Sequence, residues 1–336
     1  MQSDLKQIRM GLTKEQLDWI NKMSGKRTGG GKKVKNGNAE AWADEEMEFT
    51  CRPSMGLDDV AGMDELKETI KESFINVIRH ANVAKQFGIR PPAMLLYGPS
   101  GCGKTYFAEK MAEELDINFM KVCPEELAST LIHGTQQKIG EVFNRAERNA
   151  PTLLFLDEFD CMVPQRGDGE ASKHTNAEVN EFLCKLDKAA EREVYVVAAT
   201  NYPELIDRAV LRTGRIDEII YVDMPDRKSR ESLLKLELQR LPVESDIDYG
   251  RLADKAQGLN CSDISYVVKK AAREMFNRTI RNKGGVMQRI STAFLERLLD
   301  ERMPSVNEND LRRYKQVREK FASGKNGQKV NKIGFR

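Results

Sequence analysis

Eight consecutive residues combine three glycines with a lysine and a hydroxyl side chain, a set that can bind phosphate. Residues 98–105 read GPSGCGKT and directly follow the apolar run AMLLY. Glycines let backbone N–H groups approach phosphate oxygens, and the helix expected next points its positive end at them. In this pattern Lys104 reaches the β- and γ-phosphates and Thr105 binds Mg²⁺. The spacing therefore predicts a site for a nucleoside triphosphate with Mg²⁺.

Two acidic residues end a second apolar run, which reads LLFLDE at residues 153–158. Open α/β sheets bind ligands at the carboxyl ends of their strands, so Asp157 is expected to join Thr105 around Mg²⁺. Glu158 would orient and polarise the water that attacks the γ-phosphate. An acidic pair after a strand is by itself more often a solvated strand end. The phosphate loop favours the catalytic interpretation.

A third apolar run, VYVVAAT, is followed by Asn201, whose amide can contact the γ-phosphate and the attacking water. Farther along, Arg212 and Arg215 stand on either side of Gly214, where both can face the γ-phosphate of a neighbouring subunit. Each feature alone is typical of an ordinary turn, because Asn is a common turn former and paired arginines are often solvated. With the preceding motifs they complete a set of residues for γ-phosphate hydrolysis.

Short apolar runs alternate with helical spacing over residues 55–224. The runs are residues 93–97, 118–122, 152–156, 194–199 and 219–222. Continuous apolar runs are typical of parallel strands buried on both faces, and such strands need crossover helices. This pattern predicts a three-layer α/β domain with a parallel sheet. Over residues 225–303 the spacing is helical, as in Ile264, Val267 and Ala271, and predicts a small all-helical lid domain.

The flanking segments differ from these two domains. Residues 1–24 carry Thr13 and Gln16 at capping-box spacing before an apolar stripe, which predicts one amphipathic helix. Residues 25–54 are first rich in Gly and Lys and then acidic, which is typical of a flexible charged linker. Residues 304–336 are expected to form a C-terminal helix followed by a basic disordered tail.

Composition sets the broad class of the protein. The chain has 336 residues, of which 40% are hydrophobic and 32% charged, as in a globular protein of roughly two domains. The net charge of +2 does not indicate a strongly basic protein of the kind that binds nucleic acid as its main ligand. Six cysteines without a CxxC pair indicate reduced thiols rather than a zinc site, and the N-terminus lacks an apolar signal segment. We therefore expect a cytoplasmic protein with no metal beyond nucleotide-bound Mg²⁺ and no membrane partner.

These motifs make the chain similar to the AAA family, nearest in pattern to the branch of katanin, spastin and valosin-containing protein. The resemblance runs from about Leu57 to Arg273 through LDDVAG, LLYGPSGCGKT, LLFLDEFD, AATNYPELIDRAVLRTGRIDE, YVDMPDRKSR and GLNCSDI. It implies a P-loop sheet of order 5-1-4-3-2, ATP as the nucleotide, and hydrolysis to ADP and phosphate. It also implies a closed ring of identical subunits, most often a hexamer. A single module with short extensions would suit a bacterial protein.

The resemblance also assigns roles to individual residues. Asn201 becomes the sensor-1 residue, and Arg212 and Arg215 become arginine fingers that act on a neighbouring subunit. Cys261 stands where the family usually has glycine, and Glu237 where many relatives have a ribose-contacting histidine. The residues implied to bind the nucleotide are Asp59, Val60, Ala61, Pro99, Ser100, Gly101, Cys102, Gly103, Lys104, Thr105, Tyr106 and Ser262.

One loop departs from the family pattern. Relatives project it into the central pore of the ring with an aromatic residue, whereas residues 129–136 read STLIHGTQ. In this pore loop of Leu131, Ile132 and His133, Leu131 or Ile132 takes the gripping position. An aliphatic side chain gives up ring stacking worth about 0.5–1.5 kcal/mol per contact. His133 can titrate near neutral pH, although a solvent-facing loop histidine is the more ordinary interpretation.

Three functions agree with these motifs. The expected one is an ATP-hydrolysing ring, a homo-oligomer and most often a hexamer, that remodels or unfolds a protein substrate. The alternative is an ATP-gated regulatory or assembly module that controls a separately encoded effector enzyme, a protease or a nuclease. A nucleic-acid motor is the third, because residues 25–35 are basic, but these residues lack interleaved aromatic side chains for base stacking.

Overall fold

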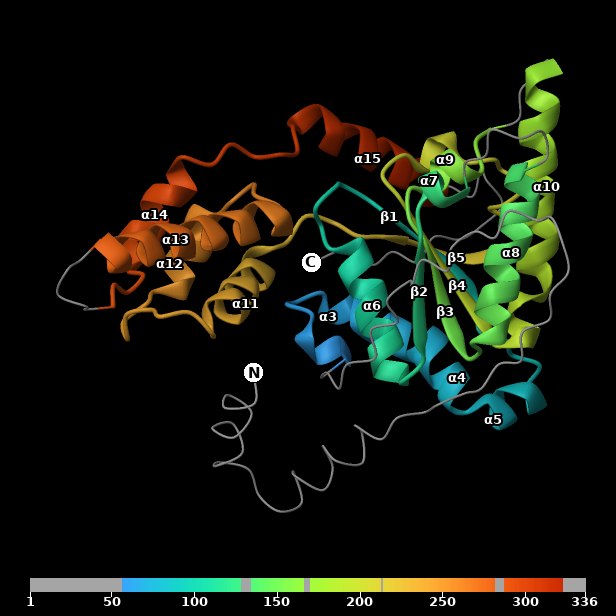
Figure 1. Ribbon diagram of the computed structural model, residues 1–336, viewed down its shortest axis with the longest axis horizontal. Coiled ribbons are helices and arrows are strands. Elements are labelled where there is room, and N and C mark those ends of the chain that lie inside the picture. Colours follow the sequence, from blue (N-terminus) through green and yellow to red (C-terminus); the bar gives the residue numbers. More distant parts are fainter. Residues whose placement is uncertain (1–55, 128–133, 166–169, 213, 282–286, 323–336) are drawn as a thin grey trace, which may run out of the picture. The chain divides into compact units, whose positions relative to one another are not determined.

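A sheet of five parallel strands carries the fold, in the order β2-β3-β4-β1-β5 (Figure 1). The computed structural model describes residues 56–127, 134–165, 170–212, 214–281 and 287–322. The strands are β1 (Ala93–Tyr97), β2 (Asn118–Val122), β3 (Thr152–Leu156), β4 (Val194–Thr200) and β5 (Ile216–Tyr221). Read from the other edge, this is the order 5-1-4-3-2, so the predicted order and the parallel α/β fold are confirmed.

The two faces of the sheet are both apolar because side chains alternate along a strand. In β1, Leu95 and Tyr97 belong to the hydrophobic core on one face, and Met94 and Leu96 belong to the core on the other. All four side chains are fully buried. Burial on both faces explains why the strands read as unbroken apolar runs in the sequence.

Helices from the first part of the described chain cover one face. Phe74, Phe107 and Met111 are buried in this core. The elements of this layer are η2 (Gly56–Asp59), α3 (Asp64–Ile70), the π-helical η3 (Lys71–Ile75), α4 (Asn76–Arg79) and α6 (Lys104–Leu115). Helix α5 (Ala81–Gln86) follows α4 in the chain.

The opposite face is covered by helices that include one from the end of the chain (Figure 1). Ile139, Phe143 and Ala146 form the buried stripe of α8, and Phe321 enters the same core from α15. These helices are α8 (Gly134–Arg148), α10 (Glu170–Ala189) and α15 (Glu308–Ala322). Short elements join the strands and helices: α7 (Pro124–Leu127), α9 (Phe159–Met162), η4 (Ala190–Arg192) and η5 (Pro203–Leu205).

Four further helices form a core of their own after β5. They are α11 (Arg227–Leu238), α12 (Tyr249–Lys255), α13 (Cys261–Arg281) and α14 (Thr292–Asp300). The predicted stripe of Ile264, Val267 and Ala271 is fully buried in this core. Within the described residues, every helix is too short or too polar to cross a membrane.

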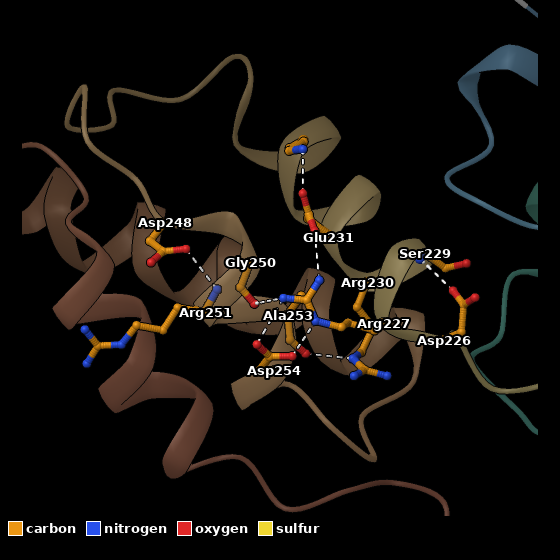
Figure 2. A network of polar contacts seen from close by, with 11 residues as sticks. Asp226, Arg227, Ser229, Arg230, Glu231, Asp248, Gly250, Arg251, Ala253 and Asp254 are labelled. Carbon is orange, nitrogen blue, oxygen red and sulfur yellow. Dashed lines mark hydrogen bonds and ion pairs between the residues drawn. The ribbon is translucent and has the colours of Figure 1, made fainter.

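Polar contacts join α11 to α12 (Figure 2). Asp226 and Asp248 cap the two helices by accepting backbone N–H groups of their first turns. Arg227 binds both carboxylate oxygens of Asp254 at 2.5 and 3.1 Å, but both side chains are more than half exposed, so the pair contributes little stability. Arg230 is buried and donates to a backbone carbonyl of α12 at 2.9 Å. This contact therefore stabilises the helix pair more than the exposed pair does.

A buried carboxylate joins α13 to the chain that leaves α14. Asp263 is fully buried and accepts hydrogen bonds from the guanidinium of Arg302 at 3.0 Å and the hydroxyl of Ser305 at 2.5 Å. Burial raises the pKa of Asp263, but the hydrogen bonds from Ser305 and Arg302 outweigh burial and hold the pKa below its ordinary value of 3.8. Asp263 is therefore ionised in the folded protein.

We predict that Asp263→Asn lowers the free energy of unfolding by about 3 kcal/mol at neutral pH, because Arg302 loses a buried partner. Folding lowers this pKa, so the contribution of Asp263 is present above its ordinary value and is lost as pH falls through the folded-state value. The difference between variant and wild type should therefore shrink in acid. Urea denaturation followed by circular dichroism at neutral and acid pH measures both effects.

The matched control is Asp300→Asn, which removes an exposed ion pair with Lys255 at 2.7 Å. This change should cost less than about 1 kcal/mol. Equal losses for the two variants would contradict the assigned role of Asp263.

Candidate active site

The chain turns sharply from β1 into α6, and glycine makes the turn possible. Gly98 has a φ of 150°, and a Cβ there would lie 2.1 Å from the carbonyl oxygen of Val222. Gly103 has a φ of 89° and stands at the N-terminus of α6. The strand, loop and helix that the motif requires are therefore all present, with the positive end of the helix at the loop.

The ammonium group of Lys104 is held inside this loop. It donates to the carbonyl oxygens of Gly98 and Pro99, both at 2.9 Å, and to Oδ1 of Asn201 at 2.7 Å. The residue is 9% exposed, and burial lowers the pKa of Lys104 to about 8. The fold thus brings Lys104 and Asn201 together, although they are far apart in the sequence.

Thr105 and Asp157 also meet at this edge of the sheet. The hydroxyl of Thr105 lies 3.4 Å from Oδ2 of Asp157. A hydroxyl and a carboxylate oxygen side by side are ligands that Mg²⁺ prefers, so these two residues fit the predicted ion. The ammonium of Lys121, from β2, bonds the same carboxylate oxygen at 2.8 Å. This third partner was not predicted from the sequence.

Glu158 follows Asp157 with an exposed side chain and an unusual backbone. Its φ is 48°, in the left-handed region that residues with a side chain seldom adopt. Its backbone N–H donates to Oδ1 of Asp157 at 3.1 Å. Such backbone strain is concentrated at functional sites. The Glu158 side chain is therefore exposed next to Asp157, which contacts Thr105 at the end of the phosphate loop.

Asp59 ends η2, and Val60 and Ala61 follow it, beside α6. The hydroxyl of Tyr106 donates to the carbonyl oxygen of Asp59 at 3.3 Å, and Lys110 binds the Asp59 carboxylate at 3.0 Å. Val60 is buried, and Ala61 is partly exposed. Tyr106 and Lys110 thus hold the end of η2 against α6, the helix that begins at the phosphate loop.

The start of α13 reaches the phosphate loop as well. Oδ1 of Asn260 accepts the N–H of Asp263 at 2.7 Å and caps the helix, while Nδ2 donates to the carbonyl oxygen of Ser100 at 3.0 Å. The backbone N–H of Ser262 donates to the carbonyl oxygen of Gly101, also at 3.0 Å. Ser262 was predicted from the resemblance and Asn260 was not, because the spacing Asn-x-x-Asp indicates a helix cap but not a second contact.

Glu237, one of the residues that depart from the family pattern, has a partner within the chain. Glu237 accepts a hydrogen bond from the hydroxyl of Ser265 at 2.6 Å.

Burial raises the pKa of the Cys102 thiol to about 12 and that of the Cys261 thiol to about 11. Both thiols are therefore protonated at neutral pH and are not suited to act as nucleophiles.

The two arginines near Gly214 differ in their surroundings. Arg212 is exposed. Arg215 donates to the carbonyl oxygen of Ala209 at 2.9 Å and lies 3.5 Å from the carboxylate of Asp187, so it is bound to its own domain. The predicted pore-loop residues Leu131, Ile132 and His133 lie outside the described residues.

Comparison with known proteins decides the family. Residues 94–224, which run from β1 past β5, match the model described as "ATPase family associated with various cellular activities (AAA)". The chain contains an ATPase domain of the AAA family. Its sheet and phosphate loop are therefore those of an AAA ATPase domain, and the predicted family and ATPase class are confirmed.

Several curated proteins are similar to this AAA chain. A "Putative ribosome biogenesis ATPase nvl" from Dictyostelium discoideum is 33% identical over 268 residues, which cover 78% of the chain and 31% of that protein. "Protein CdcH" from Halobacterium salinarum is 34% identical over 281 residues, covering 83% and 37%. A "Cell division cycle protein 48 homolog" from Archaeoglobus fulgidus is 32% identical over 279 residues, covering 80% and 38%. The matched region spans about a third of the length of each relative.

We predict that Asn260→Ser weakens nucleotide binding about threefold, because serine can still cap α13 but loses the amide that bonds Ser100. Titration with a fluorescent ADP analogue measures this affinity. Asn307→Ser is the matched control, since Asn307 accepts the N–H of Asp310 at 2.9 Å as the cap of α15. The prediction fails if both variants bind the analogue as wild type does.

Proposed function

We propose that this AAA chain hydrolyses ATP and uses the energy to remodel or unfold a protein substrate. The observation that carries the proposal is the meeting of Lys104, Thr105, Asp157 and Asn201 at the carboxyl ends of β1, β3 and β4. Their side chains supply one cation, one amide and two oxygen ligands. This combination suits phosphoryl transfer, which needs positioning and charge stabilisation more than covalent chemistry.

Each residue then has a distinct task during hydrolysis. Lys104 binds phosphate oxygens, and Thr105 and Asp157 hold Mg²⁺, which neutralises charge on the phosphates when it is bound. Asn201 aligns the γ-phosphate and the attacking water. Glu158 orients that water and accepts its proton. Burial lowers the pKa of Lys104, and an incoming phosphate would favour the charged form.

Arg212 is proposed to act on the ATP of a neighbouring subunit, with Arg215 beside it. The exposure of Arg212 supports this role, because its guanidinium can reach another chain. The contacts of Arg215 with Ala209 and Asp187 would hold the turn in place. A site shared between subunits requires a closed ring, and we propose a hexamer in the cytoplasm. Leu131, Ile132 and His133 are proposed to contact the substrate in the pore.

We predict that Glu158→Gln binds ATP and loses at least about a hundredfold in turnover, because the water loses its base. Release of phosphate and retention of labelled ATP measure the two properties. Glu193→Gln is the matched control, since Glu193 shares the left-handed backbone, with a φ of 57°, but precedes β4 at the other end of the strands. Full turnover in Glu158→Gln would remove Glu158 from the mechanism.

We predict that Arg212→Ala loses about a hundredfold or more in turnover with ATP affinity nearly unchanged, because an arginine finger acts on the transition state. Wild-type turnover per subunit should rise with protein concentration, since the site needs two subunits. Arg208→Ala, which changes a nearby exposed arginine, serves as the control. A dilution series with mass measured in parallel tests both statements, and wild-type rates in Arg212→Ala would exclude the shared site.

A further inference from the structure

Helix α15 lies outside residues 94–224, which match the AAA family, yet it packs on the sheet beside the site. Tyr314, Val317 and Phe321 are buried along one stripe of the helix. The ring of Phe321 lies 5.4 Å from that of Tyr97, the last residue of β1, and the next residue is the first of the phosphate loop. The helix thus contacts the sheet where the proposed active site begins.

Two adjacent residues of α15 donate to one backbone oxygen. The hydroxyl of Tyr314 lies 2.8 Å from the carbonyl oxygen of Asn201, and Nη2 of Arg313 lies 3.1 Å from it. The side chain of Asn201 in turn accepts a hydrogen bond from Lys104 at 2.7 Å. A single residue therefore connects α15 to the phosphate loop.

The guanidinium of Arg313 is fixed by more than this contact. It stacks on the ring of Tyr202 at 4.5 Å and on that of Tyr314 at 4.7 Å. It also lies 3.6 Å from the carboxylate of Glu204. Stacking of a planar guanidinium on aromatic rings is what distinguishes arginine from lysine at such a site. The α15 helix therefore holds the whole segment from Asn201 to Glu204.

The hydroxyl of Tyr314 is suited to act as a permanent donor. The residue is 2% exposed, and burial raises its pKa to about 12. The hydroxyl therefore keeps its proton at neutral pH. Its ring lies 6.1 Å from that of Tyr221, the last residue of β5, so the ring would stay in place without the hydroxyl.

We propose that Tyr314 and Arg313 are positioning residues, which hold the carbonyl of Asn201 and so direct its amide toward Lys104 and the γ-phosphate. Asn201 lies just beyond the end of β4, where the sheet no longer fixes the backbone. An amide that aligns a reacting phosphate must be held within a fraction of an ångström. The inference rests on the proposed ATP hydrolysis.

The test compares Tyr314→Phe, Arg313→Gln and the double variant in the full-length chain. Tyr314→Phe should lower kcat about fivefold and the double variant about twentyfold, with the KM for ATP within about twofold of wild type. Arg312→Gln is the matched control, because Arg312 is exposed and pairs with Glu308 of its own helix at 3.2 Å. A wild-type kcat in the double variant would overturn the proposal, as would a loss shared equally by Arg312→Gln.

Hydrogen–deuterium exchange gives a second readout that does not require turnover. Amide exchange in a peptide covering residues 200–206 should rise severalfold in Tyr314→Phe and stay unchanged in Arg312→Gln, while melting temperatures stay equal. Unchanged exchange in Tyr314→Phe would overturn the role of α15 even if the chain hydrolyses ATP. A wild-type chain without ATP turnover would instead contradict the proposed function, and the exchange result would still decide whether α15 holds Asn201.

Discussion

The site depends on how the carbonyl oxygens of the phosphate loop are bonded. Lys104 donates to the carbonyls of Gly98 and Pro99, and α13 supplies donors to the next two, through Asn260 to Ser100 and Ser262 to Gly101. Four consecutive carbonyls therefore have donors from within the protein. A carbonyl oxygen facing a phosphate would repel it, so a loop with bonded carbonyls can present its N–H groups to the anion.

The strand order brings further partners to the phosphate loop. Lys104 is buried, and its charge needs acceptors from outside its own loop as well as within it. Asn201 can supply one because β4 pairs with β1, so the residue that follows β4 lies next to the phosphate loop. Asp157 follows β3, the next strand across, and reaches Thr105 at the start of α6. The sheet thus converts distant positions in the chain into one polar cluster.

Local patterns allowed the fold and the core of the site to be predicted. Unbroken apolar runs mark strands that are buried on both faces, and glycine spacing marks a turn that requires positive φ. Strand order is different, because the runs do not specify which strands pair, and it came from the family resemblance. The structure brings the motif residues Lys104, Thr105, Asp157 and Asn201 together, because Asp157 and Asn201 directly follow β3 and β4 while Lys104 and Thr105 begin α6.

Contacts between elements far apart in the chain could not be predicted in this way. Lys121 was part of a strand run, and nothing in its spacing indicated a bond to Asp157. Tyr314 and Arg313 lie in a polar helix with a short apolar stripe, and such a stripe shows that a helix packs without showing against what. Asn260 stands at capping distance before Asp263, and that spacing does not indicate that its side-chain amide also donates to Ser100.

These unpredicted contacts share a physical role. Each donor bonds an oxygen of a residue in the proposed active site: Lys121 bonds Asp157, Tyr314 bonds Asn201, and Asn260 bonds Ser100. A motif determines which groups face the nucleotide, but it leaves their backbone free to move at the strand ends, where ladder hydrogen bonds stop. Supporting donors restrict that freedom: Lys121 lies on β2, Asn260 directly precedes α13, and Tyr314 lies on α15. The helices after β5 therefore complete the site rather than merely flank it.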